Sequence, residues 1–320
     1  MLLRGIDFPP VFNAAGARAF FGEGYRADRL WGPLRPSFAG CGLTAKTTTL
    51  FLTKGNMPSG DDGITPVEML PRCIYVDFFK GIMLNAVGLS GPGAEALLRD
   101  GRWQSWSEPF FVSFSVSSWH LEGRLEELEM FVKLLKEHLP DFRSPVGLEF
   151  NISCPNIRHA DSNAMIFEVP HFIDQVRCLN LPLQFKFNAL ADMALVADVC
   201  SHPECDAVVL SNTIPWRALS NWINWDSLFG SDEVSPLKRR GFSDGGLSGW
   251  PLLDVVCDRI AQLRACGFQK PIWACGGIDS KSAVEKVARA GATGIHIGCV
   301  KSLRPWRVPG IIRRAHELFD

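Results

Sequence analysis

The chain has 320 residues, of which 47% are hydrophobic, and a formal net charge of -1 at pH 7. This size and composition predict a soluble globular protein with a large core, organised as two domains or as one large barrel. Lysine and arginine are mixed with acidic residues throughout, so the sequence predicts no nucleic-acid partner and no polybasic membrane patch. A small-molecule substrate is favoured instead.

No apolar run approaches the roughly 20 residues that a membrane span needs, and the first residues do not resemble a secretory signal. We therefore expect a cytoplasmic protein without a membrane partner. The ten cysteines lie mostly in strand-like or helix-like runs, and no pair has C-x-x-C spacing. Reduced thiols are expected, and no metal site is predicted.

Apolar, strand-like runs alternate with amphipathic, helix-like runs, which is typical of a parallel sheet with crossover helices. Helices are predicted at residues 93–98, 125–139 and 251–266. Strands are predicted at residues 11–15, 40–46, 110–116, 146–151, 183–187, 207–212, 271–275 and 294–298. Eight such units predict an α/β fold, a single (β/α)8 TIM barrel domain over residues 1–320.

Two long interruptions, at residues 47–109 and 214–249, predict extended βα loops. Loops of this length on a barrel usually serve as lids or binding loops.

The segment 147–156, Gly-Leu-Glu-Phe-Asn-Ile-Ser-Cys-Pro-Asn, predicts a buried strand followed by a loop that carries Cys154. Strands of α/β barrels present functional side chains at their carboxyl ends. A cysteine chosen at random is more often inert and buried, because free cysteine is among the most buried residue types. Its neighbours decide whether Cys154 is reactive.

Two lysines stand at the ends of apolar strands, where a charge needs a partner. Lys46 and Lys186 could each neutralise an anionic cofactor or lower the pKa of a thiol. For Lys186, a salt bridge at the edge of the core is an equally good interpretation.

Asparagines occupy equivalent positions at four strand ends: Asn85, Asn151, Asn156 and Asn212. An amide offers both hydrogen-bond donors and acceptors, so a ring of amides suits a ligand that combines amide, imide and carboxylate groups. A single asparagine in such a position is more often a turn residue.

Three glycine clusters late in the chain follow the order of a phosphate site. Residues 245–249 precede a predicted helix, Gly276 and Gly277 open another helix, and Gly298 ends the last predicted strand. Backbone N–H groups at helix N-termini bind phosphate, and in barrels this site follows strands seven and eight. The cluster at residues 88–93 lacks the spacing of a dinucleotide-binding motif and predicts a shaped turn.

In their order along the chain, these motifs resemble those of the dihydroorotate dehydrogenase family, FMN-dependent (β/α)8 barrels of pyrimidine biosynthesis. The resemblance begins at about residue 11 and rests on Ala14-Ala-Gly16, Lys46-Thr47, Gly55-Asn56, Asn85-Ala-Val-Gly-Leu89, Asn151-Ile-Ser-Cys-Pro-Asn156, Lys186, Asn212-Thr213, Gly245-Gly-Leu-Ser-Gly249, Gly276-Gly-Ile278 and Ile297-Gly298. The cysteine and the early first strand resemble the soluble, cysteine-type class.

The resemblance implies that Cys154 is the general base that takes a proton from C5 of dihydroorotate while hydride passes from C6 to flavin N5, with Lys46 as a second catalytic residue. It implies a substrate site made of Lys46, Asn85, Gly88, Leu89, Asn151, Asn156, Asn212 and Thr213. It implies an FMN site made of Ala15, Gly16, Lys46, Thr47, Asn151, Lys186, Ser248, Gly249, Gly276, Gly277, Gly298 and Cys299.

The same resemblance implies a homodimer, with room for an electron-transfer subunit. The sequence does not distinguish between two electron acceptors, which are fumarate and NAD reached through such a partner.

The chain departs from the family pattern at several positions. The family's Gly-Asn-Pro-x-Pro-Arg loop is Gly55-Asn-Met-Pro-Ser-Gly60 here and lacks the arginine, and Ser90-Gly91 replaces a second asparagine. His296 and Cys299 replace the common glutamine and threonine beside the last phosphate glycine.

Three alternatives share these residues. One is an FMN-dependent dihydropyrimidine dehydrogenase of the dihydrouracil type, which usually has a histidine where this chain has Asn156. Another is a phosphate-binding barrel lyase that uses Lys186 as a Schiff base. The third is a non-catalytic flavin-binding relative.

Overall fold

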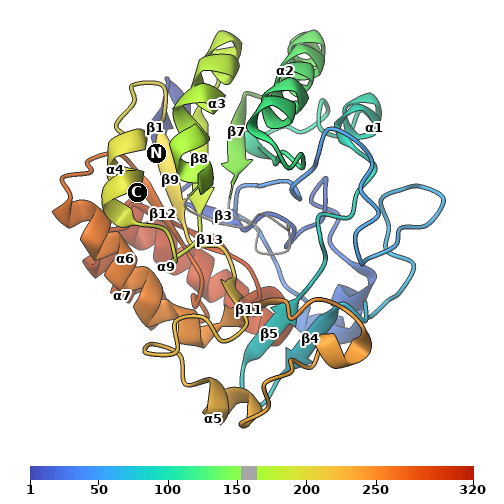
Figure 1. Ribbon diagram of the computed structural model, residues 1–320, viewed down its shortest axis with the longest axis vertical. Coiled ribbons are helices and arrows are strands. Elements are labelled where there is room, and N and C mark those ends of the chain that lie inside the picture. The colour runs from blue at the N-terminus through green and yellow to red at the C-terminus, as the bar shows by residue number, and fades with distance from the viewer. Residues whose placement is uncertain (153–163) are drawn as a thin grey trace.

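The computed structural model describes residues 1–152 and 164–320, so the predicted site residues Cys154 and Asn156 lie outside the described part of the chain. Its centre is a curled, seven-stranded parallel sheet with the order β3-β13-β12-β9-β8-β7-β6 (Figure 1). The strands are β3 (Val11–Asn13), β6 (Phe110–Phe114), β7 (Val146–Asn151), β8 (Leu183–Phe187), β9 (Ala207–Leu210), β12 (Ile272–Cys275) and β13 (Gly294–Ile297). Seven of the predicted strands are thereby confirmed, and the fold is α/β.

The segment at residues 40–46 differs from the prediction of a continuous strand. It makes only isolated parallel bridges, Phe12↔Gly42 toward β3 and Thr44↔Phe111 toward β6. It therefore lies between the two edge strands without a regular ladder to either. Its glycines explain part of the difference, because glycine has no side chain to pack and weakens a strand.

Helices cover the outer face of the parallel sheet (Figure 1). They are α2 (Leu121–His138), α3 (Val169–Val176), α4 (Met193–Val199), α6 (Leu253–Ala265), α7 (Lys281–Arg289) and α9 (Val308–Phe319). The predicted helices at residues 125–139 and 251–266 correspond to α2 and α6. Capping fixes two of the starts: the Asp192 carboxylate accepts from the Ala194 N–H at 2.8 Å before α4, and the Ser280 hydroxyl accepts from the Ala283 N–H before α7.

Shorter helices lie in the connections: α1 (Ala94–Arg99), α5 (Trp225–Phe229), α8 (Val300–Leu303) and 3-10 segments that include Arg26–Leu34. The first of these matches the short helix predicted at residues 93–98. None of the described helices is long and apolar enough to cross a membrane.

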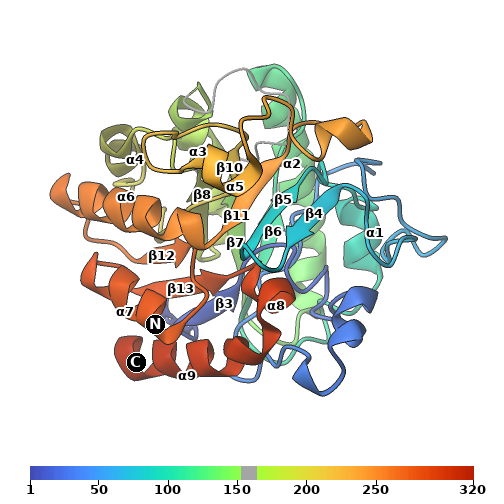
Figure 2. The same ribbon diagram turned by 90° about the horizontal axis from the view of Figure 1, so that it is seen from below.

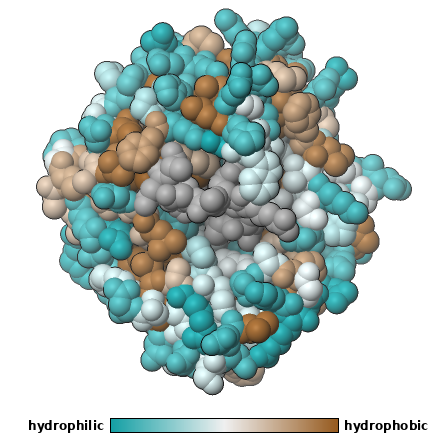
Figure 3. Space-filling view, in the orientation of Figure 1, coloured by the Kyte–Doolittle hydropathy of each residue, from teal (hydrophilic) through white to brown (hydrophobic). Residues whose placement is uncertain are grey.

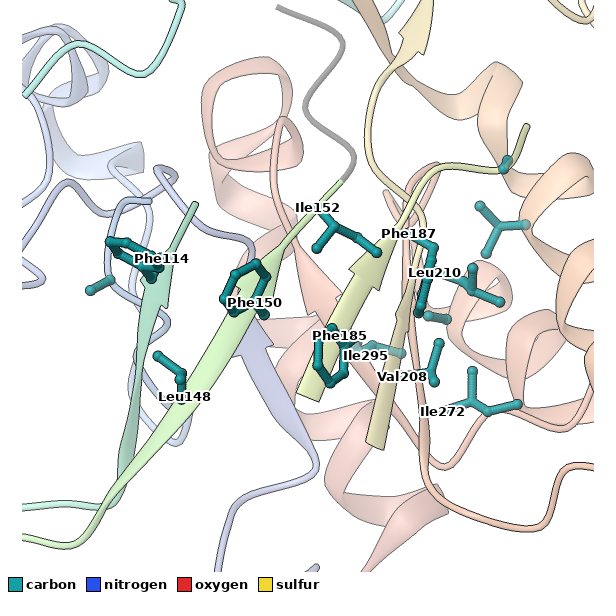
Figure 4. Close-up of a cluster of buried hydrophobic side chains, with 14 of the residues drawn as sticks. Phe114, Leu148, Phe150, Ile152, Phe185, Phe187, Val208, Leu210, Ile272 and Ile295 are labelled. Carbon is teal, nitrogen blue, oxygen red and sulfur yellow. The ribbon is translucent and has the colours of Figure 1, made fainter. Parts of the chain in front are cut away.

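Side chains alternate between the two faces of each parallel strand. Figure 4 shows Phe150, Phe185 and Val208 on the outer side, where they pack with the helices in the main hydrophobic core. The intervening residues Glu149 and Lys186 are also buried but belong to the inner side. Residues two apart on a strand therefore point to the same face of the sheet, at different positions along the strand axis.

The inner side of the sheet is apolar at its amino end and polar toward its carboxyl end. A separate core cluster fills the amino end, with members that include Phe8, Phe12, Phe111 and Trp273. A short hairpin, β1 (Leu2–Leu3) and β2 (Ile6–Asp7), leads into this plug. Buried polar residues follow farther along the same strands, among them Ser113, Glu149, Gln184 and His296.

A second, antiparallel sheet lies beyond the carboxyl ends of the parallel strands (Figure 2). Its four strands have the order β10 (Ile214–Pro215), β11 (Gly246–Gly249), β5 (Ile82–Asn85) and β4 (Ile74–Asp77). Both predicted long loops therefore contribute strands to this one antiparallel sheet. The glycine cluster at residues 245–249, expected as a loop before a helix, is largely strand β11, and α6 follows after one 3-10 turn.

On the face shown in Figure 3, hydrophobic side chains occur in small groups among hydrophilic ones.

Candidate functional site

A cavity of about 1100 Å³ lies between the carboxyl ends of the parallel strands and the antiparallel sheet. Both sheets line it: Lys186 and Cys275 come from β8 and β12, and Asn85 and Ser248 come from β5 and β11. A single drug-sized ligand usually occupies a pocket of roughly 300–1,000 Å³. The cavity therefore has room for a cofactor together with a small substrate.

Most of the predicted site residues line this one cavity. They are Ala15, Gly16, Lys46, Thr47, Asn85, Gly88, Leu89, Asn151, Lys186, Asn212, Thr213, Ser248, Gly276, Gly277, Gly298 and Cys299. Gly249 is buried at the end of β11 and is not among the lining residues. Residues separated by more than 250 positions in the sequence are thus brought to one place.

The two predicted lysines occupy different parts of the wall. Lys186 is only 4% exposed, and it pairs in register with Asn151 on the neighbouring strand. Lys46 hydrogen-bonds through Nζ to the Ser90 carbonyl oxygen, and Nζ lies 4.5 Å from the centroid of the Phe20 ring. Two buried cations in one cavity favour an anionic or electron-rich ligand there.

Two asparagines, Asn151 and Asn212, are hydrogen-bonded to each other near the carboxyl end of the polar inner side of the parallel sheet. Asn212 donates through Nδ2 to Asn151 Oδ1 at 3.0 Å, and Asn151 donates through Nδ2 to Thr47 Oγ1 at 3.1 Å. The Thr213 N–H donates to Asn212 Oδ1 at 2.9 Å. The positions of both amides are therefore set by the protein before any ligand binds.

The turn at residues 85–90 also faces the cavity. Gly88 and Leu89 both have left-handed φ values, 70° and 58°. Asn56 supports this turn, because its Nδ2 donates to the Ala86 carbonyl oxygen at 2.6 Å. A non-glycine residue in this conformation is uncommon and is found mostly where neighbouring structure enforces it.

The loop between β12 and α7 brings main chain to the cavity. A Cβ atom on Gly277, whose φ is 75°, would lie 2.4 Å from the Leu253 backbone nitrogen. Only glycine fits so close to the start of α6. Gly298 and Cys299 occupy the corresponding place after β13, and burial raises the pKa of the Cys299 thiol to about 12, so that this end of the cavity carries no thiolate at neutral pH.

Two buried groups below the lysine are uncharged. Burial, together with the nearby Lys186 ammonium, lowers the pKa of His296 well below its usual value. Burial raises the pKa of Cys275, which pairs in register with His296. Lys186 is consequently the cation on this side of the cavity, beside a neutral imidazole and a neutral thiol.

The sequence did not predict a set of wall residues that comes from the 3-10 segment and from α8. Tyr25 donates its hydroxyl to the Gly16 carbonyl oxygen at 2.7 Å, and Lys301 Nζ lies 2.5 Å from Asp28 Oδ1. Burial raises the pKa of Tyr25 and lowers that of Lys301. Arg72 and Arg240 also line the cavity and were not predicted.

No local signal identifies this set, because Asp28 and Lys301 are 273 residues apart in sequence. Within residues 1–152 and 164–320, no group of three or more His, Cys, Asp or Glu side chains is arranged to hold a metal ion.

Comparisons with known proteins extend these observations. The family model described as "Dihydroorotate dehydrogenase" matches residues 65–318. The catalytic subunit of dihydroorotate dehydrogenase B (NAD(+)) from Geotalea daltonii is 30% identical over 237 residues, which cover 70% of this chain and 68% of the relative. The same subunit from Streptococcus pneumoniae (strain ATCC BAA-255 / R6) is 25% identical over 244 residues, 74% of this chain and 72% of the relative.

A putative dihydroorotate dehydrogenase A (fumarate) from Aquifex aeolicus is 24% identical over 233 residues, 70% of this chain and 68% of the relative. Among solved structures, DHODH from Eimeria tenella in complex with ferulenol has a TM-score of 0.63 at 17% identity, and the match covers 97% of this chain and 84% of that one. At this identity the structural likeness bears on the fold alone.

Proposed function

The chain belongs to the dihydroorotate dehydrogenase family, and from this premise we propose that it is an FMN-dependent oxidoreductase that oxidises dihydroorotate to orotate in pyrimidine biosynthesis. The observation that carries the proposal is one cavity lined by Lys46, Lys186 and the amides of Asn85, Asn151 and Asn212. Cations and amides together suit a ring that bears imide and carboxylate groups.

The residues present fit FMN. Gly277, whose main chain packs closely against Leu253, and Gly298 both line the cavity, and glycine positions offer backbone N–H groups, which are the donors that phosphate prefers. We propose that Gly276, Gly277, Gly298, Cys299 and Ser248 hold the phosphate end of the cofactor. FMN supplies the hydride acceptor when it is bound.

Lys186 is the residue we assign to the flavin ring. A buried ammonium next to an electron-rich ring stabilises negative charge there, and the neighbouring His296 and Cys275 are neutral and do not compete for that role. Ala15, Gly16 and Thr47 line the same cavity, and we assign them to the cofactor as well.

For the substrate, we propose that Lys46, Asn85, Asn151, Asn212 and the turn at Gly88-Leu89 bind the ring and its carboxylate. Cys154, with Asn156 beside it, is proposed as the general base for the C5 proton. Both follow closely in sequence after β7, the strand that places Asn151 in the cavity.

We further propose that residues 40–46 complete an eight-stranded barrel and that residues 1–320 form one domain. The bridges from this segment to both β3 and β6 support the closure. As partners we propose a second copy of this chain and an electron-transfer subunit, since the two relatives named dihydroorotate dehydrogenase B are catalytic subunits.

The test is anaerobic mixing of the purified flavoprotein with dihydroorotate, dihydrouracil and NADH in separate experiments. We expect a flavin absorption spectrum that dihydroorotate bleaches, and no comparable bleaching by dihydrouracil. Cys154→Ala should slow the reduction by dihydroorotate on the order of 10² or more, as expected for loss of a general base.

A colourless protein that binds no FMN would refute the cofactor. Bleaching by dihydrouracil alone would instead indicate the related dihydropyrimidine activity. Reduction of the Cys154→Ala protein within about tenfold of wild type would refute the role of Cys154 and leave the substrate assignment intact.

A further inference from the structure

A continuous chain of hydrogen bonds connects a buried glutamate to the substrate side of the cavity. Ser113 donates through Oγ to Glu149 Oε1 at 2.9 Å, and Ser113 Oγ lies 2.9 Å from Thr47 Oγ1. From Thr47 the chain continues through Asn151 to Asn212, with donor–acceptor distances of 3.1 and 3.0 Å. We call these residues, Glu149, Ser113, Thr47, Asn151 and Asn212, the Glu149 relay.

The deep end of the Glu149 relay is isolated from solvent and from the cavity. Glu149 and Ser113 are both 0% exposed, and neither lines the cavity wall. The second carboxylate oxygen, Oε2, accepts from Gln184 Nε2 at 3.1 Å. His296 Nδ1 lies 3.8 Å from that oxygen, which is too far for a hydrogen bond.

Because Glu149 accepts a hydrogen bond at the buried end of the relay, the donor and the acceptor are fixed in every other hydrogen bond of the relay. A carboxylate can only accept, so the single hydroxyl proton of Ser113 is committed to Glu149. The bond between Ser113 and Thr47 must then use the Thr47 proton, and Thr47 Oγ1 is left as an acceptor for the Asn151 amide. This matches the observed donation from Asn151 Nδ2.

The same logic continues to the cavity. With Nδ2 of Asn151 turned to Thr47, its Oδ1 faces Asn212 and accepts from that amide nitrogen. The Oδ1 of Asn212 accepts from the Thr213 N–H. Each amide nitrogen carries two hydrogens, and within the described part of the chain each has one acceptor, so one N–H of each remains for a ligand.

We propose that Glu149 is a positioning residue that orients the Asn151 and Asn212 amides so that both present N–H donors to the oxygens of the substrate. This inference rests on the proposed function, because it assumes that the ligand is an oxygen-rich ring such as orotate. Glu149 acts through the relay and does not touch the ligand.

Glu149→Gln is the decisive variant, because it keeps the shape and removes the obligatory acceptor. The glutamine amide can donate to Ser113, which frees Ser113 to donate to Thr47 and removes the constraint on Asn151. We expect orotate to bind the FMN-loaded variant about tenfold more weakly, since donors to a charged ligand are lost. Binding is measured by titration of the flavin absorption spectrum.

Ser113→Ala cuts the relay at its second member and should weaken orotate binding by a similar factor. The double variant Glu149→Gln/Ser113→Ala should lose no more than either single variant, because both act on one path. Ser115→Ala is the matched control: Ser115 is a buried serine on the same stretch of chain, and it donates to the backbone oxygen of Asn151 at 2.8 Å but takes no part in the relay. It should bind orotate within about twofold of wild type.

The inference is overturned if Glu149→Gln binds orotate as wild type does, or if the losses of the two single variants multiply in the double variant. If Glu149→Gln does not fold, Ser113→Ala against Ser115→Ala decides in the same way.

Wild-type flavoprotein that binds no orotate would refute the proposed function but not the relay. Hydrogen exchange of asparagine side-chain amides, followed by NMR without ligand, then decides the relay. The Asn151 amide should be protected in wild type and in Ser115→Ala, and should exchange at least tenfold faster in Ser113→Ala. Equal protection in all three proteins would overturn the relay.

Discussion

His296 has surroundings that are unusual for a histidine. It is fully buried on β13, and neither of its ring nitrogens has a hydrogen-bond partner in the described part of the chain. Burial, with Lys186 nearby, lowers its pKa well below the usual value. The imidazole is therefore neutral in the folded protein at any pH near neutrality.

This pKa shift predicts a dependence of stability on pH. The folded-state pKa lies below the unfolded value of about 6.5, so the unfolded chain binds an additional proton when the pH falls below that value. The free energy of unfolding should consequently fall between pH 7.5 and 5.5, with about 1 kcal/mol of the loss due to His296. Urea unfolding at the two pH values measures it.

His296→Gln supplies the comparison, since glutamine does not titrate. Its loss of stability over the same pH interval should be smaller than that of wild type by about 1 kcal/mol. Equal losses in the two proteins would show that His296 does not titrate on unfolding as argued.

At the scale of elements, the junction of β12 and α7 determines the proposed phosphate end of the cavity. The sequence locates this junction well, because an apolar strand is followed directly by Gly276 and Gly277, which open the next predicted helix. What the sequence does not show is the neighbour: Gly277 packs against the first residue of α6, Leu253. That contact joins two strand–helix units.

Gly277→Ala is expected to release FMN. The added Cβ would lie 2.4 Å from the Leu253 nitrogen at a φ of 75°, so the loop must move away from its position in the wall. We expect the retained flavin to fall at least tenfold, measured as the ratio of flavin to protein absorption after desalting.

The Gly267→Ala variant distinguishes the effect of the close contact with α6 from the effect of placing alanine at a left-handed φ. Gly267 has a similar φ of 86°, but a Cβ there would meet nothing within 4 Å. It should cost some stability and leave the flavin content unchanged. A similar loss of flavin from both variants would assign the effect to general destabilisation.

At the scale of the whole molecule, the parallel sheet curls until its two edges meet the same stretch of chain. Strands β3 and β6 are the edges, and residues 40–46 bridge to both. The contact is tight on the β3 side, where a Cβ on Gly42 would lie 2.3 Å from the Phe12 ring. Phe12 belongs to the apolar plug that closes the amino end of the interior.

Gly42→Ala should therefore destabilise the whole fold, by about 1–3 kcal/mol, because the added Cβ would overlap the Phe12 ring, which is fully buried between the rings of Phe111 and Trp273. The measurement is the free energy of unfolding in urea. Gly60→Ala is the control, because its nearest neighbours to an added Cβ are 3.8 Å away and its φ is not left-handed. Equal unfolding free energies for Gly42→Ala and wild type would show that residues 40–46 pack loosely against β3.

The sequence by itself determined the seven strands of the parallel sheet, the outer helices α2 and α6, and the lysines, asparagines and glycines that face the cavity. These features follow from local patterns: alternation sets the face of Lys186 and Asn151, and glycine pairs after strands mark the loops. The family resemblance added the substrate and cofactor, and the family match supports both.

Only the tertiary structure decided the remaining features. Tyr25 and Lys301 meet across almost the whole chain, and each hydrogen bond of the Glu149 relay joins residues far apart in sequence. Residues 246–249 form strand β11 because pairing with the distant strand β5, and not local propensity, sets their conformation. Contacts between residues far apart in sequence leave no periodic pattern, so the sequence does not predict them.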